Sequence, residues 1–206
     1  MTSAANMKSG KGFIDGVISE LASFWDVRPG HEDELNAACR RFTETVRHLD
    51  PEKAVHTGLR DTRHVIFDDG RRLLWATTFE TDWDVYIDDA ILNVGIVNFL
   101  DWMQHTTQGE AVQAWVESAG GVEKLDPNDL EIEQTVRRTS GRLKEIIQSA
   151  QVSAAAYFNA LAPLTLTQVN KAQSLEQAFQ QVLDDPAAGE ALQHPALKPL
   201  LEQAAD

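Results

Sequence analysis

The chain has 206 residues, and 43% of them are hydrophobic, which is enough for one ordinary globular core. Its 32 acidic residues outnumber the 18 basic ones, and the formal net charge of −14 repels both a nucleic-acid backbone and an anionic membrane surface. We therefore predict a single domain over residues 1–206 that binds neither nucleic acid nor membrane.

The beginning of the chain and its cysteine content bear on the compartment. Residues 1–12 are small and polar, and no apolar run of the kind that a secretory signal needs follows them. No stretch approaches the roughly 20 apolar residues that cross a bilayer. Cys39 is the only cysteine, so an intrachain disulfide is impossible and a reducing compartment is the natural one. These features predict a cytoplasmic protein whose residues 1–16 are flexible.

The first predicted strand covers residues 18–28, where side chains alternate between two faces. One face carries Leu21, Ser23, Trp25 and Val27, and the other carries Ala22 and Phe24. Pro29 and Gly30 end this strand, and the acidic residues 32–34 then favour the start of a helix. The helix is predicted to continue to about Asp50, with an apolar stripe of Leu35, Cys39, Phe42, Val46 and Leu49 facing the core.

A β-hairpin is the clearest element of the sequence. Its predicted strands span residues 55–68 and 71–80, and they flank the turn Asp68-Asp69-Gly70. In the first strand Val65 and Phe67 point to one face and His64 and Ile66 to the other. In the second strand the sets are Leu73, Trp75, Thr77 and Phe79 against Leu74, Ala76 and Thr78.

The order of elements then predicts the fold class. After the hairpin, Asp82 can cap a helix that runs toward His105, with an interruption at Gly95. Strand, helix, strand, strand and helix make up most of a ferredoxin-like α+β domain, which needs one more strand to complete a four-stranded antiparallel sheet. Residues 151–161 alternate suitably and are the best candidate for that strand. Helices on one face would leave the opposite face to be buried in a homodimer.

Two further segments are predicted to be helical. Residues 106–150 form an insertion with a short helix over 110–119, a break at Gly120-Gly121 and a longer helix over 131–150. By its position this insertion is a cover or lid. Residues 163–206 form a C-terminal helical extension that Pro186, Pro195 and Pro199 divide into short pieces.

The sequence also resembles a known superfamily in three stretches. Residues 24–35 (FWDVRPGHEDEL) resemble the first strand, Pro-Gly and acidic helix start of dimeric α/β-barrel proteins of the ferredoxin-like superfamily. Residues 63–70 (RHVIFDDG) and 73–80 (LLWATTFE) resemble the second and third strands of these proteins. The resemblance covers residues 18–89 and, more loosely, 154–167. It implies a pocket between the sheet and its helices, and often a dimer formed by two sheets packed together.

That superfamily includes quinone-forming monooxygenases, chlorite dismutases and dye-decolorising peroxidases, so the fold alone does not choose an activity. The resemblance makes haem one candidate cofactor. However, the Gly-x-x-Asp-Gly motif of the dye-decolorising peroxidases is missing, because Asp69-Gly70 has no preceding glycine at the required place. Haem-binding residues are therefore not transferred to this chain, and the cofactor stays open.

Aromatic residues near the predicted sheet suggest a pocket for a planar ligand, although core packing explains the same residues. His64 is the candidate for a chemical role, since imidazole carries protons near neutral pH. The predicted ligand contacts are Arg63, His64, Trp75, Tyr157 and Asn159. We also predict that His64 and Trp75 approach one cavity, with the 106–150 insertion closing over it.

The carboxylates Asp82, Asp84, Asp88 and Asp89 cluster at a helix start, but no glycine-punctuated calcium loop accompanies them. Helix capping and a solvated face explain them, so no metal site is predicted. Motifs for nucleotide binding, serine hydrolysis and zinc proteolysis are also missing. Two hypotheses remain. The first is a small-molecule-binding protein, with an oxidoreductase or oxygenase-like enzyme as one form of it. The alternative is a non-catalytic dimeric binding or interaction protein.

Overall fold

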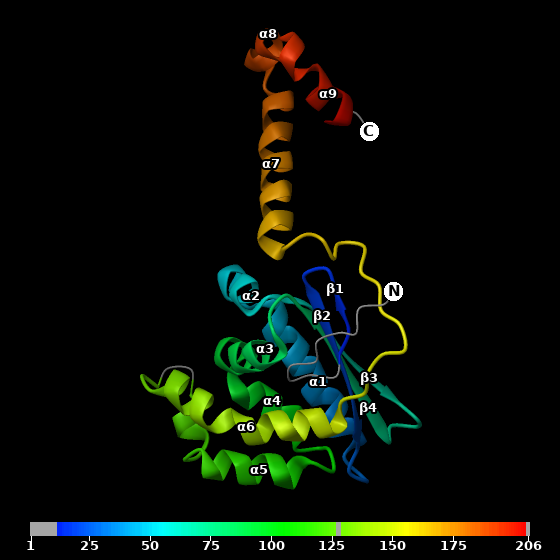
Figure 1. Ribbon diagram of the computed structural model, residues 1–206, viewed down its shortest axis with the longest axis vertical. Coiled ribbons are helices and arrows are strands. Elements are labelled where there is room, and N and C mark those ends of the chain that lie inside the picture. Colours follow the sequence, from blue (N-terminus) through cyan, green and yellow to red (C-terminus); the bar gives the residue numbers. More distant parts are fainter. Residues whose placement is uncertain (1–11, 127–128, 205–206) are drawn as a thin grey trace. The chain divides into compact units, whose positions relative to one another are not determined.

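The computed structural model describes residues 12–126 and 129–204, which form two compact units divided between Thr165 and Leu166 (Figure 1). In the first unit the strands are β1 (Ile14–Asp15), β2 (Ile18–Asp26), β3 (Leu59–Phe67) and β4 (Arg72–Phe79). Its helices are α1 (Glu32–Arg47), α2 (Pro51–Thr57), α3 (Trp83–Ala90), the π-helix Ile91–Gly95, α4 (Ile96–Met103), α5 (Gly109–Ser118), the 3-10 helix Val122–Leu125 and α6 (Ile132–Ala150). Of the segment 1–16 that is predicted to be flexible, residues 1–11 lie outside the described residues.

The strands form one antiparallel sheet in the order β1-β2-β4-β3, so the α+β fold class with a four-stranded antiparallel sheet is confirmed. The first long strand β2 lies beside β4, and β4 lies beside β3, as in a ferredoxin-like sheet. Helices α1 and α2 connect β2 to β3, and α3 follows the hairpin. The chain therefore has the predicted order of elements up to this point.

The hairpin of β3 and β4 has the predicted alternation. His64 pairs with Trp75 and Val65 pairs with Leu74 across the two strands. The connecting turn uses left-handed backbone at Asp68 (φ 55°), Asp69 (φ 53°) and Gly70 (φ 85°). Aspartate and glycine are among the residues that tolerate this conformation best, which explains why this sequence makes the turn.

The predicted fourth strand is wrong. Residues 151–161 contribute only one bridge, between Gln151 and Ser23, and the Val152 amide donates a hydrogen bond to the Ala22 carbonyl at 2.8 Å. Beyond that bridge the segment leaves the edge of β2. The short strand β1 pairs with Ile18 and Ser19 on the same edge, and the alanine-rich sequence after Val152 has little intrinsic preference for a strand.

The strand predicted over residues 55–68 begins later, because residues 51–57 form helix α2. Pro51 occupies the first turn, where its missing N–H costs nothing, and the Asp50 carboxylate caps the helix by accepting from the Glu52 amide. Gly58 ends α2 in a left-handed conformation (φ 69°). Strong start and stop signals thus override the strand pattern at this point.

The other predicted helices are confirmed within a few residues. The stripe on α1 is buried at Leu35, Cys39 and Phe42. The helix after Asp82 is interrupted by a π-helical turn that ends at Gly95 (φ 89°), where glycine was expected to break it. Both helices of the 106–150 insertion are present as α5 and α6.

The helices cover one face of the sheet and form the core with it (Figure 1). Three tryptophans, Trp25, Trp75 and Trp102, are at most 1% exposed and meet edge-on or tilted at centroid distances of 5.3 and 5.6 Å. Ser23 lies beneath them, where its hydroxyl donates to the Trp75 carbonyl and accepts from the Trp25 indole. The Ser23 hydroxyl and the Trp25 indole are therefore paired within the core.

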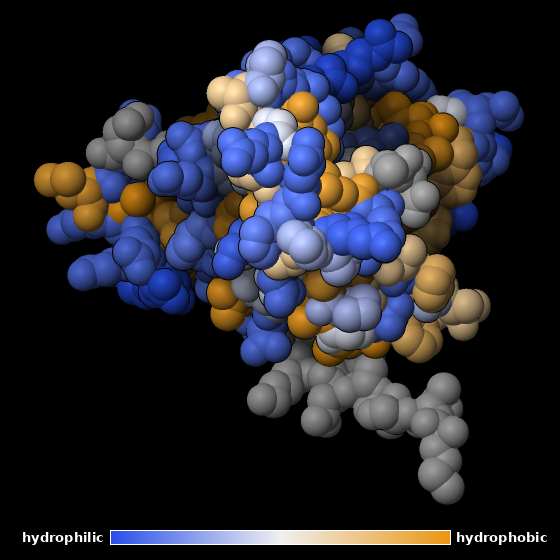
Figure 2. Space-filling view, turned by 90° about the horizontal axis from the view of Figure 1, so that it is seen from above, coloured by the Kyte–Doolittle hydropathy of each residue, from blue (hydrophilic) through white to orange (hydrophobic). Residues whose placement is uncertain are grey.

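The opposite face of the sheet, which we call the open face, carries Ala22, Phe24, Arg63, Val65, Leu74 and Ala76. Large apolar side chains also reach the surface of the first unit. Figure 2 shows orange hydrophobic side chains scattered among blue hydrophilic ones on the face of the molecule that it draws. Val65 on the open face is 43% exposed. The homodimer through this face stays a prediction.

The second unit consists of α7 (Leu166–Asp184), α8 (Gly189–Leu192) and α9 (Lys198–Ala204), with 3-10 turns at Pro186–Ala188 and Pro195–Leu197. The predicted division of this tail by prolines is confirmed. No described residue of α7 or α9 is buried. Across both units, no helix within the described ranges combines the length and the apolar character that crossing a bilayer requires.

Candidate functional site

A surface groove of about 540 Å³ runs between α1 and β3, and we call it the His64 groove. Its wall comes from α1, and its floor comes from the helix-covered face of β3. The lining residues are Asn36, Cys39, Arg40, Thr43, Glu44, Arg47, His64 and Ile66. The volume lies in the range of ligand pockets.

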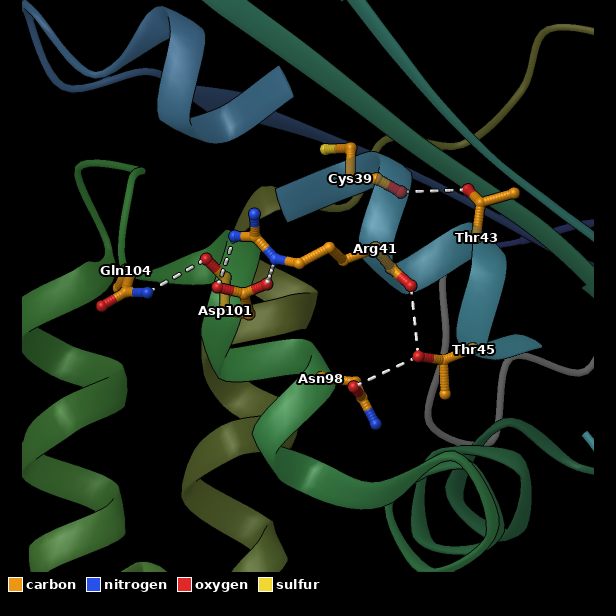
Figure 3. Close-up of polar contacts among 7 residues, drawn as sticks. All are labelled: Cys39, Arg41, Thr43, Thr45, Asn98, Asp101 and Gln104. Carbon is orange, nitrogen blue, oxygen red and sulfur yellow. Dashed lines mark hydrogen bonds and ion pairs between the residues drawn. The ribbon is translucent and has the colours of Figure 1, made fainter. Parts of the chain in front are cut away.

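Helix α1 is fixed against α4, which holds the wall of this groove in place. The Arg41 guanidinium binds the Asp101 carboxylate through two nitrogens, at 2.8 and 2.9 Å. One turn further on, the Thr45 hydroxyl contacts the side-chain oxygen of Asn98 (Figure 3). These contacts use the face of α1 that does not line the groove, so they can position the wall without filling it.

The imidazole of His64 is packed among aromatic rings. It lies parallel to Trp75, and it meets Phe42 and Trp102 edge-on at centroid distances of 5.1 Å each. Both ring nitrogens are buried, and neither has a hydrogen-bond partner among the described residues. Burying an unpaired polar atom costs about 1–3 kcal/mol, so this ring is an exception that calls for a physical explanation.

The charge states of the groove follow from burial. Desolvation lowers the pKa of His64 to about 4, so the ring is neutral at pH 7, with one N–H donor and one bare acceptor nitrogen. Desolvation, followed by the nearby Asp101 charge, raises the pKa of the Cys39 thiol to about 12. Cys39 is therefore an unreactive thiol, and His64 is a weak base but a competent hydrogen-bonding group.

The predicted site residues divide between the two faces of the sheet. His64 lines the groove, but Trp75 is fully buried beside it, with its indole N–H donating to the Thr62 hydroxyl. Trp75 therefore supports His64 from within the core and does not line the groove. Arg63 and Tyr157 line a different cavity on the open face. The side-chain nitrogen of Asn159 donates to the Tyr157 hydroxyl at 3.2 Å.

The 106–150 insertion does not close over His64, which corrects the predicted lid. Helix α5 packs against α4 and α6, and α6 packs against α3 and β2. No residue of the insertion lines the His64 groove. The reason is that α1 already occupies the space beside β3, so the insertion instead completes the helical layer over β2.

Sequence reasoning missed the α1 side of the groove. Asn36, Arg40, Thr43 and Arg47 recur at spacings of four, three and four. This spacing defines a second helical stripe beside the apolar one, and it was available in the sequence.

The acidic cluster at the start of α3 has a structural explanation. The Lys144 ammonium on α6 lies 2.9 Å from the Asp88 carboxylate and 3.8 Å from that of Asp84. Asp82 occupies the N-cap position of α3, but its side chain makes no capping hydrogen bond. Within the part of the chain that the structure describes, no three His, Cys, Asp or Glu side chains gather in a metal-binding arrangement.

The residues of the His64 groove do not fit a haem. A neutral imidazole is a suitable axial ligand, and Arg40 and Arg47 match the charge of propionates. The macrocycle itself needs broad apolar walls, and here only Ile66 and Cys39 supply apolar surface. We therefore derive no chemistry through haem.

Comparison of the chain with family models, with curated proteins and with solved structures finds no match.

Proposed function

We propose that the protein binds a small polar organic molecule in the His64 groove, as a divergent member of the dimeric α/β-barrel superfamily. The observation that carries the proposal is the pair of unpaired, buried nitrogens on His64 at the floor of a groove. A ligand with a hydroxyl or carbonyl group would satisfy one of them. The ring then gains the hydrogen bond that the folded chain does not provide.

The groove also indicates the charge of the ligand. Its rim carries Arg40, Arg47 and Glu44, and Glu44 is paired with Arg47 at 3.1 Å. The rim thus has one excess positive charge on a chain whose net charge is −14. This local reversal favours a ligand with one negative group at the rim and a hydrogen-bonding group at the floor.

The groove supports binding more strongly than catalysis. Its two chemistry-bearing groups are a thiol with a pKa of about 12 and an imidazole with a pKa of about 4, and neither is active as nucleophile or base near pH 7. The oxidoreductase form of the first hypothesis has no further residue in its favour. We expect no Soret band in protein purified from haem-supplemented cells.

The test uses 4-hydroxybenzoate, whose carboxylate matches the rim and whose phenol matches His64. Its affinity is measured by NMR titration for the wild type, for His64→Phe, and for His56→Phe as a control at an exposed histidine on α2. We expect His64→Phe to weaken binding at least roughly tenfold, since a buried hydrogen bond is lost. Unchanged binding in His64→Phe, or an equal loss in His56→Phe, would refute the proposal.

A further inference from the structure

A second cavity of about 380 Å³ lies on the open face of the sheet, under residues 152–157, which we call the strap. We propose that this strap groove binds a small organic carboxylate with an apolar body, and that Arg63 holds the carboxylate. This site is independent of the His64 groove, because the two lie on opposite faces of the sheet.

The strand register arranges the groove in rows. Glu20, Thr78 and Asp61 lie side by side at one end, and Ala22, Ala76 and Arg63 form the next row. Phe24 and Leu74 pair in the row after that. The Arg63 side chain therefore stands between a polar row and an apolar row, which is the arrangement that suits a ligand with one charged end.

Arg63 is the cation that this arrangement leaves available. Its guanidinium has no hydrogen bond or ion pair with any residue that the structure describes. The two carboxylates at the polar end already have partners: Glu20 accepts from the Phe13 amide at 3.0 Å, and Asp61 accepts from the Thr78 hydroxyl. Glu20 and Asp61 keep their negative charges, so Arg63 is the one cationic side chain among the described lining residues that can bind an anionic group.

Two backbone hydrogen bonds fix the chain on either side of the middle of the strap. At its start the Val152 amide donates to the Ala22 carbonyl, and beyond its end the Asn159 amide donates to the Asp15 carboxylate. Between these points the backbone amides of residues 154–158 make no hydrogen bond to described residues. Such a segment opens at little cost in free energy.

The hydroxyl of Tyr157 supplies the remaining polar contact for the ligand. Its hydroxyl lies 3.2 Å from the Asn159 side-chain nitrogen, which donates to it, so the hydroxyl proton is left to donate to a ligand. Alanines 154–156 keep the strap thin above the floor. The apolar body of the ligand then lies between the strap and Leu74.

The test uses three probes of the same shape and different charge: 4-phenylbutyrate, 4-phenylbutan-1-ol and 4-phenylbutylamine. Binding to the full chain is followed through the backbone amide resonances of residues 154–157. We expect the carboxylate to bind more tightly than the alcohol by roughly fivefold, the effect of a partly exposed charged contact. In Arg63→Met the acid and the alcohol should bind equally.

Arg142→Met is the matched control, because Arg142 is exposed on α6 and paired with Glu145. Leu74→Ala should weaken the acid and the alcohol alike. Equal binding of acid and alcohol to the wild type, or a preference for the amine, would overturn the proposal. If the probes changed only the resonances of His64, that result would also overturn the strap-groove proposal while leaving the proposed function intact.

Discussion

The imidazole of His64 lies parallel to the indole of Trp75, with ring centroids 6.5 Å apart and planes 12° apart. The two residues are partners across β3 and β4, so the hairpin register itself brings the rings together. Because the indole face and the neighbouring rings offer no hydrogen bond, the aromatic cluster orients the imidazole without satisfying its nitrogens. This relationship leaves the His64 nitrogens unpaired, which makes the residue a weak point in stability.

The first prediction concerns acid. Because the folded pKa of His64 is about 4 and its ordinary value is 6.5, the unfolded state binds the extra proton between these values. The contribution of neutral His64 to stability is therefore complete above pH 6.5 and is lost as the pH falls toward 4. The loss is about 3 kcal/mol by the usual conversion of pKa shifts. Urea unfolding followed by tryptophan fluorescence at pH 7, 5.5 and 4 measures it.

The matched variant for this experiment is His64→Phe, which keeps a ring in the cluster and removes the titration. We expect it to be more stable than the wild type at pH 7 by about 1–3 kcal/mol, since two unpaired polar atoms disappear. The gap should widen as the pH falls. A parallel pH dependence in the two proteins would show that His64 does not titrate as described.

The second prediction concerns His31 and His105, whose Nδ1 atoms lie 3.0 Å apart, so that one donates and the other accepts. Burial is the main cause that lowers the pKa of His105, and the charge of His31 adds to it. In His31→Asn we expect the pKa of His105 to rise toward 6.5, as measured by NMR of the ring protons. His48→Asn, at the end of α1, should leave it unchanged. An unaltered His105 titration in His31→Asn would contradict the contact.

The third prediction concerns Lys144, which is 14% exposed and bound to Asp88, itself 15% exposed. Lys144→Met should destabilise the protein by about 3–5 kcal/mol, because it leaves a poorly solvated carboxylate without its cation. The double variant Lys144→Met with Asp88→Leu should recover most of this loss. Arg142→Met, which breaks an exposed pair with Glu145, serves as the control and should change stability by less than about 1 kcal/mol. A small effect of Lys144→Met alone would disprove the buried pair.

The fourth prediction concerns self-association through the open face. We expect sedimentation at micromolar concentration to show a species of twice the 22.9 kDa chain mass, because Val65 and its apolar neighbours on this face need burial. Val65→Asp should dissociate the dimer. Val85→Asp, at a valine that is 47% exposed on α3, should not. Sedimentation of the wild type as a 22.9 kDa species alone would reject the dimer.

Elements with strong local signals could be predicted from the sequence. The Asp-Asp-Gly turn between two alternating runs predicts the β3–β4 hairpin, and the three-four spacing on α1 predicts its buried stripe. Alternation also places Arg63 and His64 on opposite faces of β3. That signal was sufficient to separate the two as site residues, so grouping them in one pocket was an avoidable error.

The sequence by itself thus determined the sheet's long strands, most of the helices and the face on which each side chain of the hairpin lies, because these depend on periodicity and turn chemistry over a few residues. The tertiary structure decided which segment takes the free edge of β2. It also decided that α1 rather than the insertion lies beside His64, and that the strap crosses the open face. These outcomes depend on competition between distant segments for the same edge or surface, and no local pattern records which of them will win.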